Sequence, residues 1–180
     1  DPAMRPRLSN GQQRLHQAMG AGTIGVVTAS RHSAFAEGDV VQHGLGFREH
    51  VLSDGRGVNH LDAAGLSPTL YMHVLGPTGF TAWGGMLITG ELKDGENVFV
   101  SAAAGAVGSV AAQIARIKGC YVIGSAGSAE KCEWLENELG LDVAINYKEG
   151  VLRKNLKAAA TEGLDVYFEN VGGEHLDPAL

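Results

Sequence analysis

The pattern of apolar and polar positions changes along the chain near Tyr71. Beyond that point, short apolar runs that suit buried parallel strands alternate with stretches whose apolar residues recur at helical spacing. The expected strands cover residues 97–101, 121–124, 143–146 and 166–168, and the expected helices cover residues 80–88, 107–117, 129–139 and 151–160. This order predicts an α/β fold, a Rossmann-type doubly wound parallel sheet with helices on its faces. Since such sheets usually have about six strands, four strands indicate a partial sheet.

The residues before Tyr71 have a different pattern, in which short candidate strands are separated by glycine and polar turns. Strands are expected at residues 25–29, 39–42 and 47–52, and the third alternates in the period-2 manner of a half-buried strand. The sequence therefore predicts two domains, a small β-rich unit over residues 1–68 and the α/β unit over residues 69–180.

Composition and charge narrow the possible function classes. Hydrophobic residues make up 44% and charged residues 19% of the chain, which is ordinary for a protein with a buried core. The net charge of −6 indicates no basic face for nucleic acid. No apolar run approaches the ~18 residues of a membrane-spanning helix. The two cysteines, Cys120 and Cys132, form no CxxC pair. We therefore expect a cytoplasmic protein that contacts neither nucleic acid nor membranes.

The strongest chemical signal is the segment SAAAGAVG at residues 101–108, which lies between an expected strand and an expected amphipathic helix. Its glycine spacing is a variant of the dinucleotide-binding fingerprint, with Ala103 in the first place. The second glycine would let the backbone approach a pyrophosphate, and the third would let the helix pack closely on its strand. Backbone N–H groups at the helix N-terminus would then bind the diphosphate. The alternative is a tight strand-to-helix turn without a ligand. The expected diphosphate-binding residues are Gly105, Ala106, Val107 and Gly108.

The end of the second expected strand indicates which dinucleotide is bound. NAD sites usually place an acidic residue there, about 20 residues beyond the glycines, to bond the ribose 2′-hydroxyl. This chain has no carboxylate at that point. Instead, Ser128 can donate a hydrogen bond and Lys131 supplies positive charge for a 2′-phosphate. Glu130 falls inside the expected helix, where we expect it to face solvent, and Lys131 could itself be a solvated helix lysine. The pattern favours NADPH.

Several further segments carry a resemblance that covers nearly the whole chain: DPAMR at 1–5, ASRH at 29–32, EGDVV at 37–41, GSAGS at 124–128, NYK at 146–148 and ENVGG at 169–173. Together with the glycine segment, they resemble the medium-chain dehydrogenase/reductase superfamily. Within it, they are most similar to the zinc-free branch of prostaglandin reductases and alkenal double-bond reductases. The resemblance implies that residues 1–68 are part of a GroES-like domain and residues 69–180 part of an NADP-binding Rossmann domain.

The resemblance also implies an activity, the NADPH-dependent reduction of the C=C bond of α,β-unsaturated ketones or aldehydes. By matching motifs, Lys131 and Tyr147 would contact the 2′-phosphate, and Asn170 would lie beside the cofactor. Taken by residue type alone, Tyr147 is an exposed strand-end aromatic and Asn170 a turn residue before two glycines. A full-length form of the protein would be a homodimer that acts on a small enone, enal or quinone.

Two positions depart from the family pattern. Ala3 and Trp83 stand where the family has tyrosines, so its substrate preference does not transfer to this chain. The chain resembles the middle part of a longer protein. We expect no metal site, because the seven histidines show no ligand spacing and no four-cysteine lobe exists.

The residues alone identify no catalytic acid or base. In hydride transfer the cofactor carries the chemistry, so the absence of a nucleophile motif is consistent with a reductase. Two alternatives stay open at this point. One is a quinone oxidoreductase, and the other is a truncated nucleotide-binding chain without catalytic activity.

Overall fold

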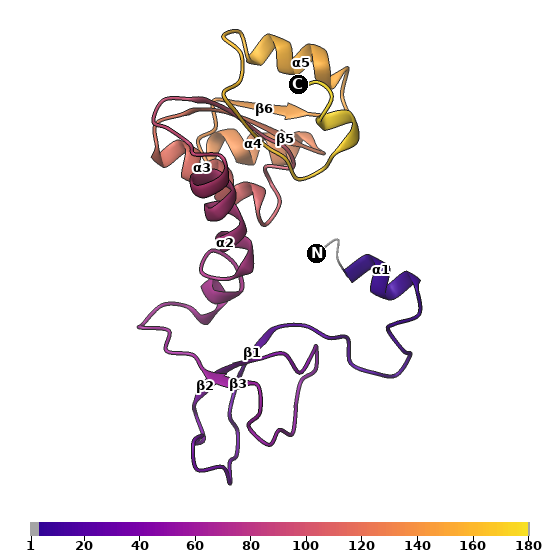
Figure 1. Ribbon diagram of the computed structural model, residues 1–180, viewed down its shortest axis with the longest axis vertical. Helices are drawn as coiled ribbons and strands as arrows, with labels where there is room; N and C mark the ends of the chain where they lie inside the picture. Colours follow the sequence, from indigo (N-terminus) through magenta and orange to yellow (C-terminus); the bar gives the residue numbers. More distant parts are fainter. Residues whose placement is uncertain (1–3, 180) are drawn as a thin grey trace. The chain divides into compact units, whose positions relative to one another are not determined.

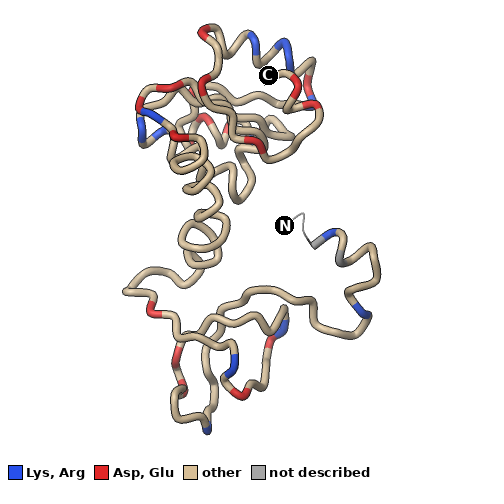
Figure 2. The backbone as a smooth tube through the Cα atoms, in the orientation of Figure 1, with Lys and Arg blue, Asp and Glu red and all other residues tan. Residues whose placement is uncertain are grey.

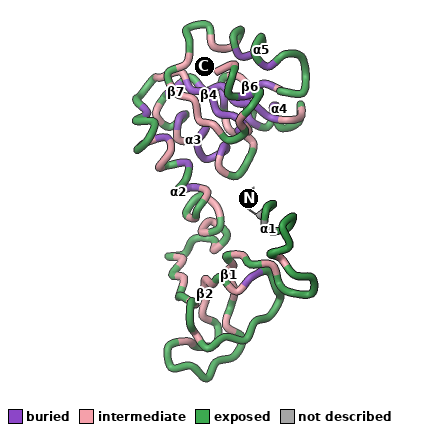
Figure 3. Tube along the Cα trace, turned by 45° about the vertical axis from the view of Figure 1, so that its right-hand side comes forward, coloured by how far each residue is buried: buried purple, intermediate pink, exposed green. Residues whose placement is uncertain are grey.

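The computed structural model describes residues 4–179, which form two compact units that divide between Met72 and His73 (Figure 1). The first unit contains an antiparallel sheet in the order β1-β2-β3, made of β1 (Thr23–Val26), β2 (Val40–His43) and β3 (Val58–His60). The central strand pairs Val41 with Gly25 on one side and with His60 on the other. Val41 is 5% exposed, while most of this unit is intermediate or exposed (Figure 3). The sheet confirms the predicted β-rich unit.

Residues 47–52 form no strand, so that part of the prediction is wrong. Phe47 is 60% exposed and Leu52 is 99% exposed, which leaves the alternating apolar side chains without a core to face. The second edge of β2 is occupied by β3, which the apolar pattern did not predict. A period-2 pattern becomes a strand only where a neighbouring strand pairs with its backbone, and the sheet within residues 4–179 offers this segment no such partner.

Two short helices of the first unit lie where only strands and turns were expected. These are α1 (Met4–Ser9) and the 3-10 helix η1 (Pro68–Met72). Pro6 falls in the first turn of α1, where its missing N–H costs no intrahelical hydrogen bond. The departure from the family pattern at Ala3 lies outside the described residues.

The second unit contains a four-stranded parallel sheet in the order β6-β5-β4-β7. Its strands are β4 (Asn97–Val100), β5 (Tyr121–Ala126), β6 (Val143–Asn146) and β7 (Val166–Phe168). Between them run α3 (Gly108–Ile117), α4 (Ala129–Asn137) and α5 (Leu152–Ala159). The alternation of strand and helix confirms the predicted Rossmann-type fold, to within a few residues at each boundary.

Helices cover both faces of this sheet, because successive strand residues point to opposite sides. Val98 and Val100 of β4 belong to one apolar cluster, together with the small residues of α3 and Leu135 of α4. Phe99, which lies between them, belongs to a second cluster with Leu152 and Leu156 of α5. The sheet is therefore doubly wound, and its buried residues are concentrated in β4, β5 and α3 (Figure 3).

The helix expected over residues 80–88 begins earlier than predicted. α2 (Pro77–Trp83) starts at a proline, which suits the first helical position, and continues into a π-helical segment η2 (Gly84–Thr89). Ala82 and Met86 are fully buried in the same cluster as β4. The short helix η3 (Gly173–His175) follows β7.

Each unit carries charges of both signs, although residues 4–36 contain arginines and no acidic residue and residues 63–90 contain no charged residue. Figure 2 shows Lys and Arg interspersed with Asp and Glu in the second unit. Among the residues described, no helix has both the length and the apolar character needed to cross a membrane.

Candidate functional site

The four parallel strands end along one edge of the sheet, where the predicted cofactor-binding residues follow them. In the strand order β6-β5-β4-β7, Tyr147 follows β6, Ser128 follows β5, residues 101–108 follow β4, and Asn170 follows β7. Since neighbouring strands lie about 4.8 Å apart, this row spans on the order of 15 Å. Open α/β sheets bind their ligands in the crevice at the carboxyl ends of the strands. The fold thus places these residues in a line, in an order that suits an extended ligand.

The loop after β4 is held in a strained conformation by the neighbouring strand. Ala102 has φ +48°, a left-handed value that costs a non-glycine residue about 1–2 kcal/mol. The fully buried Ser125 of β5 fixes this turn. Its Oγ accepts a hydrogen bond from the Ala102 N–H at 3.2 Å, and its carbonyl accepts one from the Ala103 N–H at 2.8 Å. The sequence did not indicate this role for Ser125, because the segment GSAGS that contains it does not show which backbone N–H groups its hydroxyl and carbonyl would reach.

Helix α3 begins immediately after this loop with its first N–H groups available. Val107 is the N-cap, no side chain caps the helix, and no acidic residue lies in the first turn. Within residues 4–179, the backbone N–H groups of Ala104, Ala106, Val107 and Gly108 have no acceptor. The Ala106 carbonyl, in contrast, has a partner, because it lies 3.0 Å from His73 Nε2. This contact also helps to fix the loop. Unpaired N–H groups and the helix dipole make such a terminus favourable for a phosphate.

The two glycines of the loop differ in what they allow. A Cβ at Gly108 would lie 2.4 Å from the Ala102 carbonyl oxygen and 2.9 Å from Ala103 Cα, so only glycine fits this close approach of the helix to its loop. A Cβ at Gly105 would lie 3.1 Å from the same Ala102 oxygen, which is tight, and Gly105 is otherwise exposed. This arrangement is the one expected for the third and second glycines of a dinucleotide fingerprint.

The end of β5 forms the second part of the row. Ser128 is the N-cap of α4, and its Oγ accepts a hydrogen bond from the Lys131 N–H at 3.4 Å, which leaves its own O–H able to donate. Lys131 lies in the first turn of α4 and is exposed, as is Glu130 beside it. The expectation that Glu130 faces solvent is therefore consistent with the structure.

Tyr147 lies against the turn that precedes Ser128. Its N–H donates to the Ala126 carbonyl at 3.1 Å, and a Cβ at Gly127 would lie 2.8 Å from the Tyr147 hydroxyl. The same Cβ would lie 3.4 Å from Cε of Lys148, a second cation at this point, to which the sequence analysis assigned no role. Ser128, Tyr147 and Lys148 therefore gather at the ends of β5 and β6.

Tyr147 is supported from behind by a histidine that the sequence did not indicate. The His175 ring meets the Tyr147 ring edge to face, with 4.8 Å between the centroids. His175 is 5% exposed, and its Nε2 has no hydrogen-bond partner within residues 4–179. It packs as an aromatic ring and fixes the tyrosine where β6 ends.

The end of β7 forms the last part of the row, and a network of hydrogen bonds ties it to β4. The Ser101 hydroxyl donates to Glu169 Oε1 at 2.8 Å and accepts a hydrogen bond from the Asn170 N–H at 2.7 Å. The Asn170 side-chain amide donates to the Ser101 carbonyl at 2.8 Å. Asn170, the predicted residue, is thus held at the start of the glycine loop.

Glu169 is the centre of this network. Burial alone would raise its pKa, but hydrogen bonds from the Tyr167 hydroxyl, the Gly172 and Val171 N–H groups and the Ser101 hydroxyl outweigh burial and lower the pKa to about 2. The pKa of Tyr167 is raised, first by burial and then by its bond to the carboxylate. Glu169 is therefore ionised at neutral pH.

This lowered pKa predicts a pH dependence of stability. The carboxylate is favoured in the folded chain, so its contribution is present above the ordinary Glu pKa near 4.5 and is lost as the pH falls towards 2. We expect the urea midpoint of the wild type to fall more steeply between pH 5 and pH 2 than that of Glu169→Gln, because the variant lacks this proton uptake. Parallel midpoints for the two proteins across that range would contradict the expectation.

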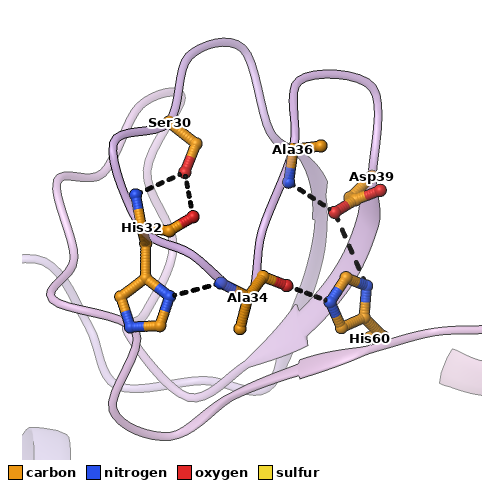
Figure 4. Close-up of polar contacts among 6 residues, drawn as sticks. All are labelled: Ser30, His32, Ala34, Ala36, Asp39 and His60. Atoms are coloured by element: carbon orange, nitrogen blue, oxygen red, sulfur yellow. Dashed lines mark hydrogen bonds and ion pairs between the residues drawn. The ribbon is translucent and has the colours of Figure 1, made fainter.

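The first unit contains a polar cluster around His60, whose contacts hold the imidazole in place. His60 Nε2 binds the Ala34 carbonyl at 2.7 Å, and its Nδ1 lies 3.7 Å from Asp39 Oδ2 (Figure 4). The Phe35 ring stacks on His60 at 4.8 Å, so this imidazole is held by partners on both nitrogens and on one face. A cavity of about 340 Å³ in this unit is lined by residues between Thr23 and Val58 and contains none of the predicted cofactor-binding residues.

No group of three or more His, Cys, Asp or Glu side chains that could hold a metal occurs in the described part of the chain. We predict that cofactor binding needs no zinc. Treatment with a chelator should leave the melting temperature and the NADPH dissociation constant unchanged, and elemental analysis should find zinc well below one atom per chain. Stoichiometric zinc whose removal unfolds the protein would refute this prediction.

Comparison with known proteins shows which families and solved structures this chain is similar to. A family model described as zinc-binding dehydrogenase matches residues 106–180, and one described as the N-terminal domain of oxidoreductase matches residues 1–61. Prostaglandin reductase 1 of Rattus norvegicus is 44% identical over 97% of this chain and 53% of its own length. The NADP(+)-dependent 2-alkenal reductase of Nicotiana tabacum is 37% identical over 100% of this chain and 55% of its own length. The crystal structure of CurA from Vibrio vulnificus in complex with NADPH is 38% identical, with a TM-score of 0.87, over 99% of this chain and 55% of that one.

The fold and the loop after β4 define a Rossmann-type α/β unit of the dinucleotide-binding class, preceded by a small β unit. The chain belongs to the medium-chain dehydrogenase/reductase superfamily, in the zinc-free branch that contains the prostaglandin and alkenal reductases. It spans about half the length of the curated relatives that it matches.

Proposed function

We propose that this protein binds NADPH along the carboxyl edge of its parallel sheet and reduces the C=C bond of α,β-unsaturated ketones or aldehydes. The observation that carries the proposal is the loop that leads into α3, where four backbone N–H groups have no acceptor within residues 4–179. Ala102 of this loop is strained, and only glycine fits at position 108. The similarity to a structure containing NADPH and to an NADP(+)-dependent 2-alkenal reductase supports the choice of cofactor and substrate class.

The described residues fit such a cofactor in the order in which they lie. Ala106, Val107 and Gly108 would bind the diphosphate through backbone N–H groups that have no acceptor within residues 4–179. The Gly105 N–H donates to the Ala102 carbonyl, so Gly105 would contribute by letting the backbone approach the diphosphate closely. At the β5 and β6 ends, the Ser128 and Tyr147 hydroxyls would donate to the 2′-phosphate, and Lys131 and Lys148 would supply charge. Asn170 would lie at the opposite end, beside the nicotinamide half.

The cofactor, when bound, supplies a hydride, and the residues of this chain supply position and electrostatics. Reduction of an enone also needs a donor that stabilises charge on the carbonyl oxygen and a proton for the α-carbon. We assign neither role to a described side chain.

The preference for NADPH over NADH rests on charge at the end of β5. An NAD site would place a carboxylate where this chain has the turn Gly127–Ser128. The acidic residue nearest to this turn along the chain, Glu130, lies in the first turn of α4 and is exposed. With two lysines close to the turn, a 2′-phosphate is favoured over a 2′-hydroxyl.

The experiment that tests the activity follows NADPH absorbance with a simple 2-alkenal, with an enone and with a quinone. Oxidation with the alkenal or the enone, and slower oxidation with the quinone, would support C=C reduction. Faster oxidation with the quinone would favour the quinone oxidoreductase. NADPH binding without oxidation by any of the three would favour a nucleotide-binding chain without catalytic activity.

A cytoplasmic location and a homodimeric full-length form stay predictions. Two free, buried cysteines and the small-molecule substrates named for the relatives are compatible with the first. The net charge of −6 supports the expectation that nucleic acid is not a partner.

A further inference from the structure

Glu169 accepts more hydrogen bonds than any motif of this chain accounts for. Its Oε1 accepts from the Ser101 hydroxyl at 2.8 Å, from the Gly172 N–H at 2.8 Å and from the Val171 N–H. Its Oε2 accepts from the Tyr167 hydroxyl. These four donors come from the end of β4, from β7 and from the turn after β7. One carboxylate therefore joins two neighbouring strand ends and the loop that leaves the sheet.

The Tyr167 donor is itself fixed. Its ring stacks on Phe99 of β4, with 5.0 Å between centroids and an interplanar angle of 13°. Phe99 is fully buried in the core on the α5 side of the sheet. The stacked ring pair therefore fixes the Tyr167 hydroxyl that donates to Oε2, and two backbone N–H groups donate to Oε1. Together these contacts restrict the position of the carboxylate.

Asn170 is connected to this carboxylate through a single hydroxyl. The Ser101 hydroxyl donates its hydrogen to Glu169, which turns its lone pairs towards the Asn170 N–H. The Asn170 Nδ2 in turn donates to the Ser101 carbonyl. Within the described residues, the Asn170 Oδ1 and its second amide hydrogen have no partner, so the amide can offer one acceptor and one donor to a ligand.

We propose that Glu169 is a positioning residue, which acts through Ser101 to hold the Asn170 amide ready to bind the nicotinamide half of the cofactor. The inference rests on the proposed function for the identity of the ligand. Nicotinamide carries a carboxamide, and its ribose carries hydroxyls, so both offer the donors and acceptors that one free amide edge can match. The low pKa of Glu169 supports the proposal, because an acceptor that is ionised at neutral pH keeps the hydroxyl of Ser101 in one orientation.

The geometry distinguishes this role from a direct electrostatic one. A glutamine at position 169 can present its carbonyl oxygen to the Ser101, Val171 and Gly172 donors, while its NH₂ group donates to the Tyr167 oxygen. Glu169→Gln therefore keeps the three acceptor contacts of Oε1, reverses the direction of the hydrogen bond with Tyr167 and removes the charge. Glu169→Ala removes all four acceptors and frees the Ser101 hydroxyl to rotate.

The test is a double-mutant cycle on NADPH affinity, measured by fluorescence with the wild type, Glu169→Ala, Asn170→Ala and the double variant. We expect each single change to weaken binding about 5- to 10-fold, the size of one hydrogen bond. Because Glu169 acts through Asn170, Glu169→Ala should weaken binding less than 2-fold in the Asn170→Ala background. Glu169→Gln should bind within about 2-fold of the wild type. Additive losses in the cycle, or a Glu169→Gln as weak as Glu169→Ala, would overturn the inference.

A second readout does not depend on the cofactor. In the ¹⁵N spectrum of the cofactor-free chain, the Asn170 side-chain NH₂ pair, identified by its loss in Asn170→Ala, should be dispersed in the wild type and in Glu169→Gln. In Glu169→Ala it should collapse towards the position of a solvated amide. An unchanged NH₂ pair in a folded Glu169→Ala would overturn the positioning role. If the spectra behave as expected and the wild type binds no NADPH, the proposed function fails and the positioning of Asn170 stands.

Discussion

Replacing Gly108 by alanine is expected to abolish useful NADPH affinity, with a loss of about 100-fold or more. The added Cβ would lie 2.4 Å from the Ala102 carbonyl oxygen and 2.9 Å from Ala103 Cα. Both are backbone atoms of the loop that carries the free N–H groups, so α3 must move away from the loop to relieve the clash. Two lost charge-assisted hydrogen bonds at about 1.5–3 kcal/mol each would account for an affinity change of this size.

The same substitution should also lower the free energy of unfolding, by about 1–3 kcal/mol, as overpacking does in a close-packed core. Gly84→Ala is the matched control, since Gly84 is helical and a Cβ there meets no atom within 4 Å. Isothermal titration and thermal unfolding of the two variants measure both effects. A Gly108→Ala protein that binds NADPH as well as Gly84→Ala does would show that the diphosphate lies elsewhere.

The second large effect is expected at Lys131, where Lys131→Ala should weaken NADPH binding about 10- to 100-fold and leave NADH binding unchanged. The reason is the loss of a charge-assisted contact to the 2′-phosphate, worth about 1.5–3 kcal/mol. Lys148, beside the Gly127 turn, supplies a second positive charge, so we expect the loss of NADPH affinity to be closer to 10-fold than to 100-fold. Removing both lysines should bring NADPH and NADH affinities close together.

Lys154→Ala is the control for a general change in charge, because Lys154 is also exposed and lies on α5 and not on α4, the helix that Ser128 caps. Titration of each variant with both cofactors, repeated at low and high salt, gives the selectivity ratio. Equal losses of NADPH and NADH affinity in Lys131→Ala would mean that the lysine does not discriminate between them. An equal loss in Lys154→Ala would point to non-specific attraction.

The α/β half of the fold could be predicted from the sequence, because its signals are local. The apolar run at residues 97–100 is buried on both faces of the sheet, and the helical stripe of α3 is buried on the face that its periodicity defines. In the β unit the prediction at residues 47–52 was wrong, since a strand needs a partner whose identity the alternation does not contain. β3, with only Val58 apolar, carries no pattern at all, and its pairing with β2 makes it a strand.

The candidate site could be predicted only as far as motifs reach. Gly105 and Gly108 could be identified from the sequence, because glycines at this fixed spacing are needed for a close approach of the backbone to the ligand and of the helix to its strand. Ser125, His73 and Glu169 could not, because each acts on a loop 20 or more residues distant in the chain, which only the folded sheet brings near. The same holds for His175 behind Tyr147. Local pattern therefore indicates which backbone meets the ligand, and tertiary contact decides which side chains hold it there.

The central claim is that NADPH lies along the carboxyl edge of the parallel sheet. Titration of the ¹⁵N-labelled chain with NADPH tests it most directly, because every backbone amide reports its own surroundings. We predict saturable shifts at Ala104 to Gly108, at Gly127 and Ser128, and at Tyr147 and Asn170, with NADH shifting the glycine loop but not the Ser128 turn to the same extent. Absence of saturable shifts, or shifts confined to the first unit, would contradict the account.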